Sequence, residues 1–347
     1  MNIEALREKI NVALTEQVAK NARMLREIDP QLNPVAEALT EYLSDGKRFR
    51  PIFALLGYLG TGGKLSEPII RAATSLEFLQ ASALIHDDLI DGSDTRRGRA
   101  AIHRKFAQLN GKPSGDQFGA AAAILIGDLA MVWNEQALHE SGIPLASTES
   151  VNPIHDVMRN ELMAGQFLDI FEQTQSSHSI ERSLKIARYK SGKYSIERPL
   201  HFGAALSNPV KLTEYFSIYS EYGLPLGEAF QLRDDLLGIF GDPAITGKPA
   251  GDDLREGKRT ALIAFTYERG SQATKKLLDQ YLGTDIDNDE LATLRSAIEE
   301  SGAATHVEGL IEKLSEQALD AIQRDEIDSL AKSLLIEMVS QVTQRNR

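Results

Sequence analysis

Apolar residues recur along most of the chain with the spacing of an α-helix. Near the N-terminus, Leu6, Ile10, Leu14 and Val18 are four residues apart. Residues 307, 310, 311 and 314 fall at the i, i+3, i+4 and i+7 positions of one helix face. Runs that alternate with period two between turn signals are hard to find. The pattern therefore predicts an all-α chain.

Glycine, proline and small polar residues divide this pattern into about ten helices. The breaks fall at residues 46, 60–64, 92, 111–115, 141–144, 176–179, 208–209, 241–257 and 283–288. The chain contains no low-complexity linker, and its only internal repeat is a pair of acidic helix ends. We therefore expect one domain over residues 1–347, built as a single large helical bundle.

The first acidic helix end lies within residues 80–99, which begin as an apolar helix and finish in acids followed by bases. On a helix that opens near Ser75 and continues to Asp91, Asp87 and Asp91 lie one above the other, with Asp88 about 100° round. Carboxylates at a helix C-terminus repel one another and oppose the macrodipole, and each effect is worth up to ~1 kcal/mol. A cation is therefore expected there, and oxygen ligands without Cys favour Mg²⁺ that shares substrate phosphate oxygens.

Arg96, Arg97 and Arg99 follow these acids, and guanidinium groups match phosphate oxygens bidentately. A solvated acidic helix end beside a basic loop is the alternative, and this stretch alone favours neither reading. A second apolar helix closes on the paired acids Asp234 and Asp235. Two such helices could face each other across a cavity, which favours the functional interpretation.

With both motifs present, the chain resembles the trans-prenyl diphosphate synthases, which elongate isoprenoids head to tail. The first motif matches their first aspartate-rich signature as Asp87-Asp88-Leu-Ile-Asp91, followed by Arg-Arg-Gly. The second matches only in part, because Gly238 stands where the last aspartate of the five-residue pattern usually sits, although Asp242 remains as part of the extended motif. The resemblance implies the isoprenoid synthase fold, a helical bundle around a central cavity.

The resemblance also assigns roles to the acids. The catalytic residues that it implies are Asp87, Asp88, Asp91, Asp234, Asp235 and Lys190. The implied metal ligands are Asp87, Asp91 and Asp234. They would hold three Mg²⁺ ions, for which Mn²⁺ could substitute. His86, beside the acids, is expected to pack between helices rather than to bind metal.

Three more segments match the family in order between residues 46 and 260. Gly-Lys-Arg-Phe-Arg-Pro at 46–51 enters a helix and resembles the isopentenyl diphosphate site. Residues 188–203 resemble the family's Lys-Thr segment, with a serine that keeps the hydroxyl, and Pro199 is expected to kink this helix. The long loop at 241–260 resembles the mobile lid. A basic turn and an internal polar network are the structural alternatives for the first two segments.

These segments supply the substrate-binding residues that the resemblance implies. For isopentenyl diphosphate they are Lys47, Arg50, Gln80 and Arg97. Around the allylic diphosphate they are Lys190, Lys248 and Lys258, with Gln166 and Asp169 facing it from the preceding helix. Arg96, Ser191 and Gln231 are also implied to bind substrate.

The composition of the chain limits which partners, metal sites and cellular locations can be expected. The net charge of −12 argues against a nucleic-acid partner, because phosphate neutralisation needs a basic surface. The absence of Cys excludes disulfides and thiolate metal sites and fits a cytoplasmic location. The N-terminus does not read as a signal peptide, and no stretch reaches eighteen apolar residues, so we expect a soluble protein that is not an integral membrane protein. The resemblance to the family also implies that the chain forms a homodimer.

The activity that the resemblance implies is a Mg²⁺-dependent prenyl transfer. Isopentenyl diphosphate would condense with dimethylallyl, geranyl or farnesyl diphosphate and release pyrophosphate. The growing product would run from Asp87 back along its own helix, at ~5.4 Å per turn or about one isoprene unit. One turn back are Ser82 and Ala83, both small, where relatives that stop at fifteen carbons usually carry an aromatic residue.

Two turns back are Phe78 and Leu79, which could form the floor of the product site together with Trp133 or Met163. The expected product is therefore geranylgeranyl diphosphate, of twenty carbons, and a longer polyprenyl or a farnesyl product is the alternative. Replacing Ser82 with Phe should shorten the product, and Phe78→Ala should lengthen it.

Two other classes of protein share parts of this pattern. A class I terpene cyclase has the fold and the first acidic motif, but it lacks a second aspartate-rich helix and a second diphosphate site. A non-catalytic subunit of a heteromeric synthase would keep the fold while losing acids, and only Gly238 favours it.

Overall fold

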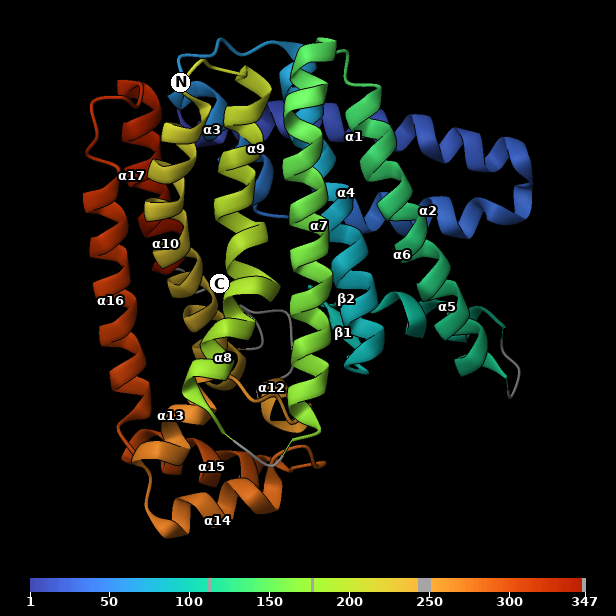
Figure 1. Cartoon of the computed structure of the whole chain (residues 1–347). Helices are drawn as coiled ribbons and strands as arrows, with labels where there is room; N and C mark the ends of the chain where they lie inside the picture. Colours follow the sequence, from blue (N-terminus) through green and yellow to red (C-terminus); the bar gives the residue numbers. More distant parts are fainter. Residues whose placement is uncertain (111–113, 176–177, 243–250, 345–347) are drawn as a thin grey trace. The chain divides into compact units, whose positions relative to one another are not determined.

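The structure is a computed structural model that describes residues 1–110, 114–175, 178–242 and 251–344. These residues are helical almost throughout (Figure 1), which confirms the all-α prediction. Within these ranges the strands are confined to a short antiparallel pair, β1 (Thr95–Arg96) and β2 (Arg99–Ala100). The contacts divide the chain into two compact units, which are described separately.

Unit 1 comprises Met1–Val151 and Phe202–Pro209. Its elements are α1 (Ile3–Ile28), the 3₁₀-helix η1 (Pro30–Leu32), α2 (Asn33–Leu43), α3 (Phe49–Gly60), α4 (Glu67–Ile90), the β1–β2 pair, α5 (Ile102–Asn110), α6 (Gly115–His139) and the start of α7 (Leu145–Gln173). Helix α4 packs against α6, α3 and α1. The acidic end of α4 is therefore mounted on the central helix of the unit.

The apolar periodicity of the N-terminus is realised in α1. Leu6, Ile10, Leu14 and Val18 are all buried, as the spacing predicts, and the Asn2 side chain caps the helix by accepting a hydrogen bond from the backbone N–H of Ala5. Helix α4 starts at Glu67, eight residues before the expected position near residue 75. A proline in its first turn favours this earlier start, whereas the N-cap Ser66 makes no side-chain capping hydrogen bond.

The core of unit 1 lies between α4 and α6. The fully buried rings of Phe78 and Trp133 meet edge to face, with centroids 6.0 Å apart. The exposed large apolar side chains of α6 are Phe118, Ile124, Leu125 and Val132. By length and composition, α6 is the one helix in the described part of the chain that could cross a membrane, a test that core helices of soluble proteins also pass.

Unit 2 comprises Asn152–His201 and Val210–Arg347. Besides the rest of α7, its elements are α8 (Ile180–Ala187), the π-helix η2 (Arg188–Glu197), α9 (Arg198–Ser207, which ends in unit 1), α10 (Leu212–Phe240), α12 (Asp252–Arg255), α13 (Ala261–Arg269), α14 (Gln272–Tyr281), α15 (Asn288–Glu300), α16 (Ala303–Ala321) and α17 (Ser329–Thr343). Helix α10 is central, since it packs against η2, α16 and α17. Figure 1 shows α10 and α16 side by side.

The chain is cut into more helices than the sequence indicates. Helices α1 to α10 and α12 to α17 make sixteen in the described ranges, against the expected ten or so. Most of the additional helices lie after α10, where Gly270 separates α13 from α14 and Gly302 separates α15 from α16, and the others come from the divisions between α1 and α2 and between α8 and α9. The pattern does hold in α16, where Val307, Ile311 and Leu314 are buried.

The segment before Pro199 differs most from expectation. A kinked α-helix was expected, but the chain forms the ten-residue π-helix η2 and resumes as α9 at Arg198, so Pro199 lies in a first helical turn. Gly192 of η2 lies against Gly227 of α10, where a Cβ on Gly227 would be 2.7 Å from the Gly192 Cα. Only glycines allow the two backbones this approach.

Candidate functional site

The three aspartates at the C-terminal end of α4 differ in their burial and in their hydrogen-bond partners. Asp91 caps the helix, and its backbone N–H donates to the Asp87 carbonyl at 2.8 Å, so these two acids lie one above the other as predicted. Asp88 is fully buried instead. Its Oδ1 accepts from Arg96 Nε at 2.8 Å and also from Arg96 Nη2. Asp88 therefore holds Arg96, while Asp87 and Asp91 share the outer face.

The three arginines after α4 lie in a short β-hairpin and have different hydrogen-bond or ion-pair partners. Its turn has Arg97 and Gly98 in the left-handed region, with φ of 52° and 73°. Arg96 then points back to Asp88, and Arg97 Nη1 donates to the Asp45 carbonyl at 2.5 Å. Arg99 is the cross-strand partner of Arg96, and its Nη1 lies 3.5 Å from a Glu41 carboxylate oxygen. The predicted group of three phosphate-binding arginines is thus divided.

The basic loop before α3 is fixed by a residue to which sequence analysis gave no role. Arg48 has a left-handed φ of 57°, and its side chain is buried. It donates from Nη1 to Glu77 Oε2 at 2.7 Å, from Nε to Asn11 Oδ1 at 2.8 Å and from Nη2 to the Leu43 carbonyl at 2.7 Å. Arg48 therefore ties the loop to α1, α2 and α4, and the only signal in the sequence was its place inside the basic motif.

The remaining residues predicted to bind isopentenyl diphosphate surround this anchor within unit 1. Lys47 is exposed, with Nζ 5.8 Å from the centre of the Phe49 ring, and Arg50 is buried. A Cβ on Gly46 would be 3.4 Å from Arg97 Nη2, so Arg97 lies directly over the loop. Gln80 is half-buried on α4, and its Oε1 has no hydrogen-bond partner among the described residues.

The four positions predicted to set product length differ in accessibility. Ala83 is half-buried and lies one turn before Asp87 on the same face of α4. Ser82, Phe78 and Leu79 are completely covered. Ala83 is therefore the member of this set that is partly exposed on the face of α4 that carries Asp87.

In unit 2, the structure brings Lys190 of η2 to Asp169 of α7, with Nζ 2.6 Å from Oδ2. The two helices touch tightly here, because a Cβ on Gly165 would be 2.3 Å from the Lys190 backbone nitrogen. Gln166 follows Gly165 at this contact, and Ser191 is half-buried beside Lys190. The resemblance places Lys190, Gln166 and Asp169 around the allylic diphosphate, with an internal polar network as the alternative for the last two, and the Lys190–Asp169 ion pair is compatible with either.

The acids of α10 separate as those of α4 do. Asp234 is half-buried, whereas Asp235 is buried and accepts from Gln231 Nε2 at 2.8 Å and from the Ala261 backbone N–H at 3.2 Å. Burial raises the pKa of Asp235 to about 8, and the hydrogen bonds from Gln231 and Ala261 oppose that rise. Asp235 and Gln231 therefore connect α10 to the start of α13, and Asp234 is the acid on the open side.

Two lysines, Lys248 and Lys258, were predicted to bind substrate from the loop that resembles the lid. Lys258 Nζ lies 3.5 Å from Asp253 Oδ1 and also pairs with Glu256. Lys248 lies outside the described residues. Asp253 was not among the predicted site residues, although it lies within the loop at 241–260 that resembles the lid.

The candidate metal ligands fit Mg²⁺ by their chemistry. Asp87, Asp91 and Asp234 offer only carboxylate oxygens, and Mg²⁺ takes one or two protein carboxylates while waters and phosphates fill its other positions. No group of three or more His, Asp or Glu side chains is close enough to hold an ion by itself in the part of the chain that the structure describes. His86 makes a packing contact, since a Cβ on Gly127 would be 2.1 Å from its Nε2.

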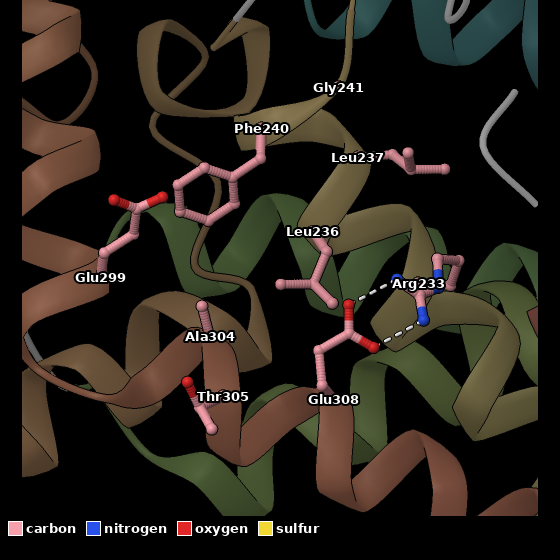
Figure 2. Close-up of a pocket in the computed structure, with 9 residues that line it drawn as sticks. All are labelled: Arg233, Leu236, Leu237, Phe240, Gly241, Glu299, Ala304, Thr305 and Glu308. Carbon is pink, nitrogen blue, oxygen red and sulfur yellow. Dashed lines mark hydrogen bonds and ion pairs between the residues drawn. The ribbon is translucent and has the colours of Figure 1, made fainter. Parts of the chain in front are cut away.

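A separate pocket of about 470 Å³ lies between α10 and α16 (Figure 2). Its lining residues are Arg233, Leu236, Leu237, Phe240, Gly241, Glu299, Ala304, Thr305 and Glu308. Arg233 and Glu308 form a two-pronged ion pair at its edge, with both N–O distances 2.6 Å. None of the predicted site residues lines this pocket.

Comparisons with known proteins agree with these motifs. The model of the family described as polyprenyl synthetase matches residues 33–300. The chain is 31% identical over 303 residues to the geranylfarnesyl diphosphate synthase of Aeropyrum pernix, covering 86% of this chain and 90% of that protein. It is 27% identical over 315 residues to the (2E,6E)-farnesyl diphosphate synthase of Mycobacterium tuberculosis, covering 87% and 83% of the two chains.

A solved structure is similar over nearly the whole chain. It is the geranylgeranyl pyrophosphate synthase of Corynebacterium glutamicum in complex with isoprenyl diphosphate and magnesium. The TM-score is 0.95 at 35% identity, over 99% of this chain and all of that one. The three similar proteins are named for three different products, so the comparisons leave product length open.

Proposed function

The chain belongs to the polyprenyl synthetase family and is a trans-prenyltransferase with the isoprenoid synthase fold, and from this premise we propose that its main product is geranylgeranyl diphosphate. The observation that carries the proposal is the small, half-buried Ala83 on the face of Asp87, one helical turn away. A turn of ~5.4 Å is about the length of one isoprene unit. An elongating chain would not meet a large side chain at this position.

The aspartates of α4 and α10 are negatively charged and would repel a diphosphate, which is negatively charged as well. Two like unit charges at about 4 Å repel by roughly 4 kcal/mol at an effective dielectric near 20. Bound Mg²⁺ would supply the positive charge that offsets this repulsion and stabilises the departing pyrophosphate. Asp87 and Asp91 in unit 1 and Asp234 in unit 2 are the residues that would hold it.

Basic side chains then bind the two substrates. Lys47, Arg50 and Arg97, with the amide of Gln80, would hold isopentenyl diphosphate. Arg97 lies over the loop that carries Lys47, and Arg50 follows this loop in the first turn of α3. Their direct hydrogen bonds to phosphate oxygens would be charge-assisted.

The allylic diphosphate would be held by residues of the first acidic motif, of the segment at 188–203 and of the loop at 241–260. Arg96 is oriented by Asp88, and Lys190 is oriented by Asp169. Ser191 and Lys258 would add a hydroxyl and an ammonium donor. When the carbon–oxygen bond to the diphosphate breaks, these donors stabilise the charge that develops on the leaving group. The C3–C4 double bond of isopentenyl diphosphate attacks the allylic cation, and the released pyrophosphate takes the proton.

A large side chain one turn from Asp87 should shorten the product. We expect Ala83→Phe and Ser82→Phe each to shift the main product from twenty to fifteen carbons. Phe at Ala83 projects from the open face, whereas Phe at the covered Ser82 must displace its neighbours toward that space, at a cost of about 1–3 kcal/mol in stability. Chromatography of the dephosphorylated products measures the shift.

A matched substitution on another face of the same helix controls for general damage. Arg71 is exposed on α4, and Arg71→Phe should leave product length unchanged. Twenty-carbon product from both the Ala83 and the Ser82 variants would show that product length is set elsewhere.

The floor of the product site is assigned to the edge-to-face pair of Phe78 and Trp133. Phe78→Ala should lengthen the product by one or more isoprene units. It should also destabilise the fold by about 3–5 kcal/mol, because the ring is fully buried. Product analysis below the lowered unfolding temperature separates the two effects, and an unchanged product length would remove Phe78 from the floor.

The test of the function is an assay of the purified chain alone. Mg²⁺, radiolabelled isopentenyl diphosphate and dimethylallyl, geranyl or farnesyl diphosphate are supplied in turn. Geranylgeranyl diphosphate should be the main product, and chelation of Mg²⁺ should abolish it. Farnesyl or longer products would refute the proposed length, and a chain without product would behave as the subunit of a heteromeric synthase.

Three further properties are proposed on the resemblance to the family. Three Mg²⁺ ions would bind per site, with Mn²⁺ able to replace them. The chain would form a homodimer, which is supported by the exposed Phe118, Ile124, Leu125 and Val132 on α6. A cytoplasmic location, without membrane insertion of α6, is proposed from the absence of Cys. Light scattering of the purified protein tests the dimer.

A further inference from the structure

One face of α7 carries three residues that contact the π-helix η2. Glu161, Gly165 and Asp169 are four residues apart, so they lie one above the other on that face. The middle residue allows a backbone contact, because a Cβ on Gly165 would be 2.3 Å from the Lys190 nitrogen. Asp169, on one side of this contact, pairs with Lys190. The carboxylate on the other side belongs to Glu161, which lies outside every motif matched in the sequence.

Glu161 binds two residues at the point where the π-helix ends. Its Oε1 accepts from Lys193 Nζ at 2.7 Å. Its Oε2 and Oε1 accept from Arg198 Nε at 2.7 Å and from Arg198 Nη2 at 2.8 Å. Lys193 belongs to η2, and Arg198 is the first residue of α9. One carboxylate therefore holds side chains from both sides of the junction between the two helices.

The backbones of the same two residues form the last hydrogen bond of the π-helix. The Arg198 N–H donates to the Lys193 carbonyl five residues earlier, which is the hydrogen bond that defines a π-helix. In an α-helix this N–H would donate to Tyr194, and side chains five residues apart would point about 140° away from each other. A single carboxylate that binds both side chains therefore favours the π-helical register over the α-helical one.

Burial and charge strengthen this link. The side chains of Glu161, Lys193 and Arg198 are 17%, 11% and 16% exposed. Burial alone would raise the pKa of Glu161, but hydrogen bonds from Arg198 and Lys193 outweigh it and lower the pKa below its ordinary value. Glu161 is therefore ionised at neutral pH, and its hydrogen bonds to both partners are charge-assisted.

A second set of buried side chains holds the junction from the side of α10. Glu197, the last residue of η2, accepts from Ser220 Oγ at 2.6 Å. His201 Nδ1 lies 3.1 Å from Arg198 Nη1, and its Nε2 lies 3.0 Å from the Phe216 carbonyl. Burial lowers the pKa of His201 to about 4, so the neutral ring donates from Nε2 and accepts at Nδ1. The end of η2 is thus fixed by both α7 and α10.

We propose that Glu161 is a positioning residue for the allylic diphosphate. It keeps η2 in its π-helical register by holding Lys193 and Arg198, and this register places Lys190 and Ser191. A π-helix is mostly limited to a single turn, so one of ten residues needs tertiary contacts of this kind. Without the link, η2 would relax toward the α-helical register and its side chains would shift around the axis. This inference rests on the proposed function, in which Lys190 and Ser191 bind the allylic diphosphate.

The alternative is a purely structural role, in which the cluster only joins α7 to α9. A loss of stability lowers the fraction of active enzyme, and therefore the measured kcat, but it leaves the KM of each substrate unchanged. A loss of register moves Lys190 and should raise the KM of the allylic substrate alone, because the groups assigned to isopentenyl diphosphate lie in unit 1. The two KM values therefore separate the roles.

The experiment compares the intact parent with Glu161→Gln, which keeps the shape of the side chain and removes its charge. We expect the KM of the allylic substrate to rise about tenfold or more, while the KM of isopentenyl diphosphate stays within about twofold of the parent value. A crystal structure of the variant should lack the hydrogen bond from the Arg198 N–H to the Lys193 carbonyl. This second measurement does not depend on activity.

Asp156→Asn is the matched control. It removes a carboxylate from an exposed ion pair with Arg159 on the same helix, and it should change neither KM. Lys193→Met is the second variant and serves if Glu161→Gln does not fold. It leaves both hydrogen bonds between Glu161 and Arg198 in place and removes only the link to η2, so the KM of the allylic substrate should rise about threefold or more.

Three results would overturn the inference. The first is a Glu161→Gln variant with the parent's KM for the allylic substrate, which would leave the cluster a structural role. The second is a variant whose η2 keeps its π-helical hydrogen bonds. The third is an equal rise of both KM values, which would indicate a general disturbance of the enzyme. If Glu161→Gln does not fold, an unchanged KM of the allylic substrate in Lys193→Met would overturn it as well.

Failure of the proposed function would look different. A parent that makes farnesyl or longer products would refute the proposed product length alone, because the KM comparison uses whichever allylic substrate the parent accepts. A parent that forms no prenyl product would overturn both proposals, since Lys190 would then have no diphosphate to bind. An active parent whose Glu161→Gln variant keeps both KM values would overturn this inference alone.

Discussion

Asp87→Asn should lower kcat by about a thousandfold while leaving the fold almost unchanged. One side chain that stabilises developing charge in a closed site is worth about a hundred- to a thousandfold in rate, and a metal ligand is expected at the upper end. Asp87 stacks with Asp91 on the outer face of α4, so its loss should change the free energy of unfolding by less than about 1 kcal/mol. Steady-state kinetics and thermal unfolding measure the two effects.

Asp88→Asn is the natural comparison, because it makes the same chemical change one residue away. Asp88 is buried and holds Arg96, so its variant should lose stability, since one partner of a buried pair is left uncompensated. Its KM for the allylic substrate should also rise, because Arg96 is no longer oriented. If Asp87→Asn retained more than a tenth of the parent kcat, the assignment of Asp87 as a metal ligand would be wrong.

Breaking the buried pair of Arg48 and Glu77 should have the largest effect on stability. Arg48→Met leaves the Glu77 carboxylate buried without its partner, which typically costs about 3–5 kcal/mol. Both side chains are almost fully buried, with 3% and 6% of their surfaces exposed, so water cannot compensate for the loss. The free energy of unfolding in denaturant measures this cost.

The double variant Arg48→Met/Glu77→Leu separates stability from substrate binding. Replacing both charges by apolar side chains should recover most of the stability. The KM for isopentenyl diphosphate should remain raised, because Arg48 also positions the backbone between Lys47 and Arg50. A double variant with both normal stability and normal KM would show that Arg48 has no positioning role.

The helical class and the main acidic positions could be predicted because they depend on spacing along the chain. A period near 3.6 residues buries one face of α1 and of α16 in any packing arrangement. Four-residue spacing places Asp87 and Asp91 on one face of α4 by helix geometry alone. The basic loop before α3 could be located from the order of the motifs, whereas the ion pair of Lys190 and Asp169 is a contact that only the structure supplies.

The helix boundaries were less predictable for a physical reason. Helix α4 begins eight residues early, with a proline in its first turn. The π-helix η2 forms where Gly192 meets Gly227, a contact between segments far apart in sequence. Local propensity does not contain such contacts.

The sequence by itself therefore determined an all-α chain with two acidic helix ends and the basic segments that go with them. Only the tertiary structure decided which acid does what: Asp88 turns inward to hold Arg96, and Asp235 turns inward to accept from the first residue of α13. The reason is that a carboxylate's role depends on its burial and on the partner within about 3 Å. Both are fixed by packing between segments that are distant along the chain.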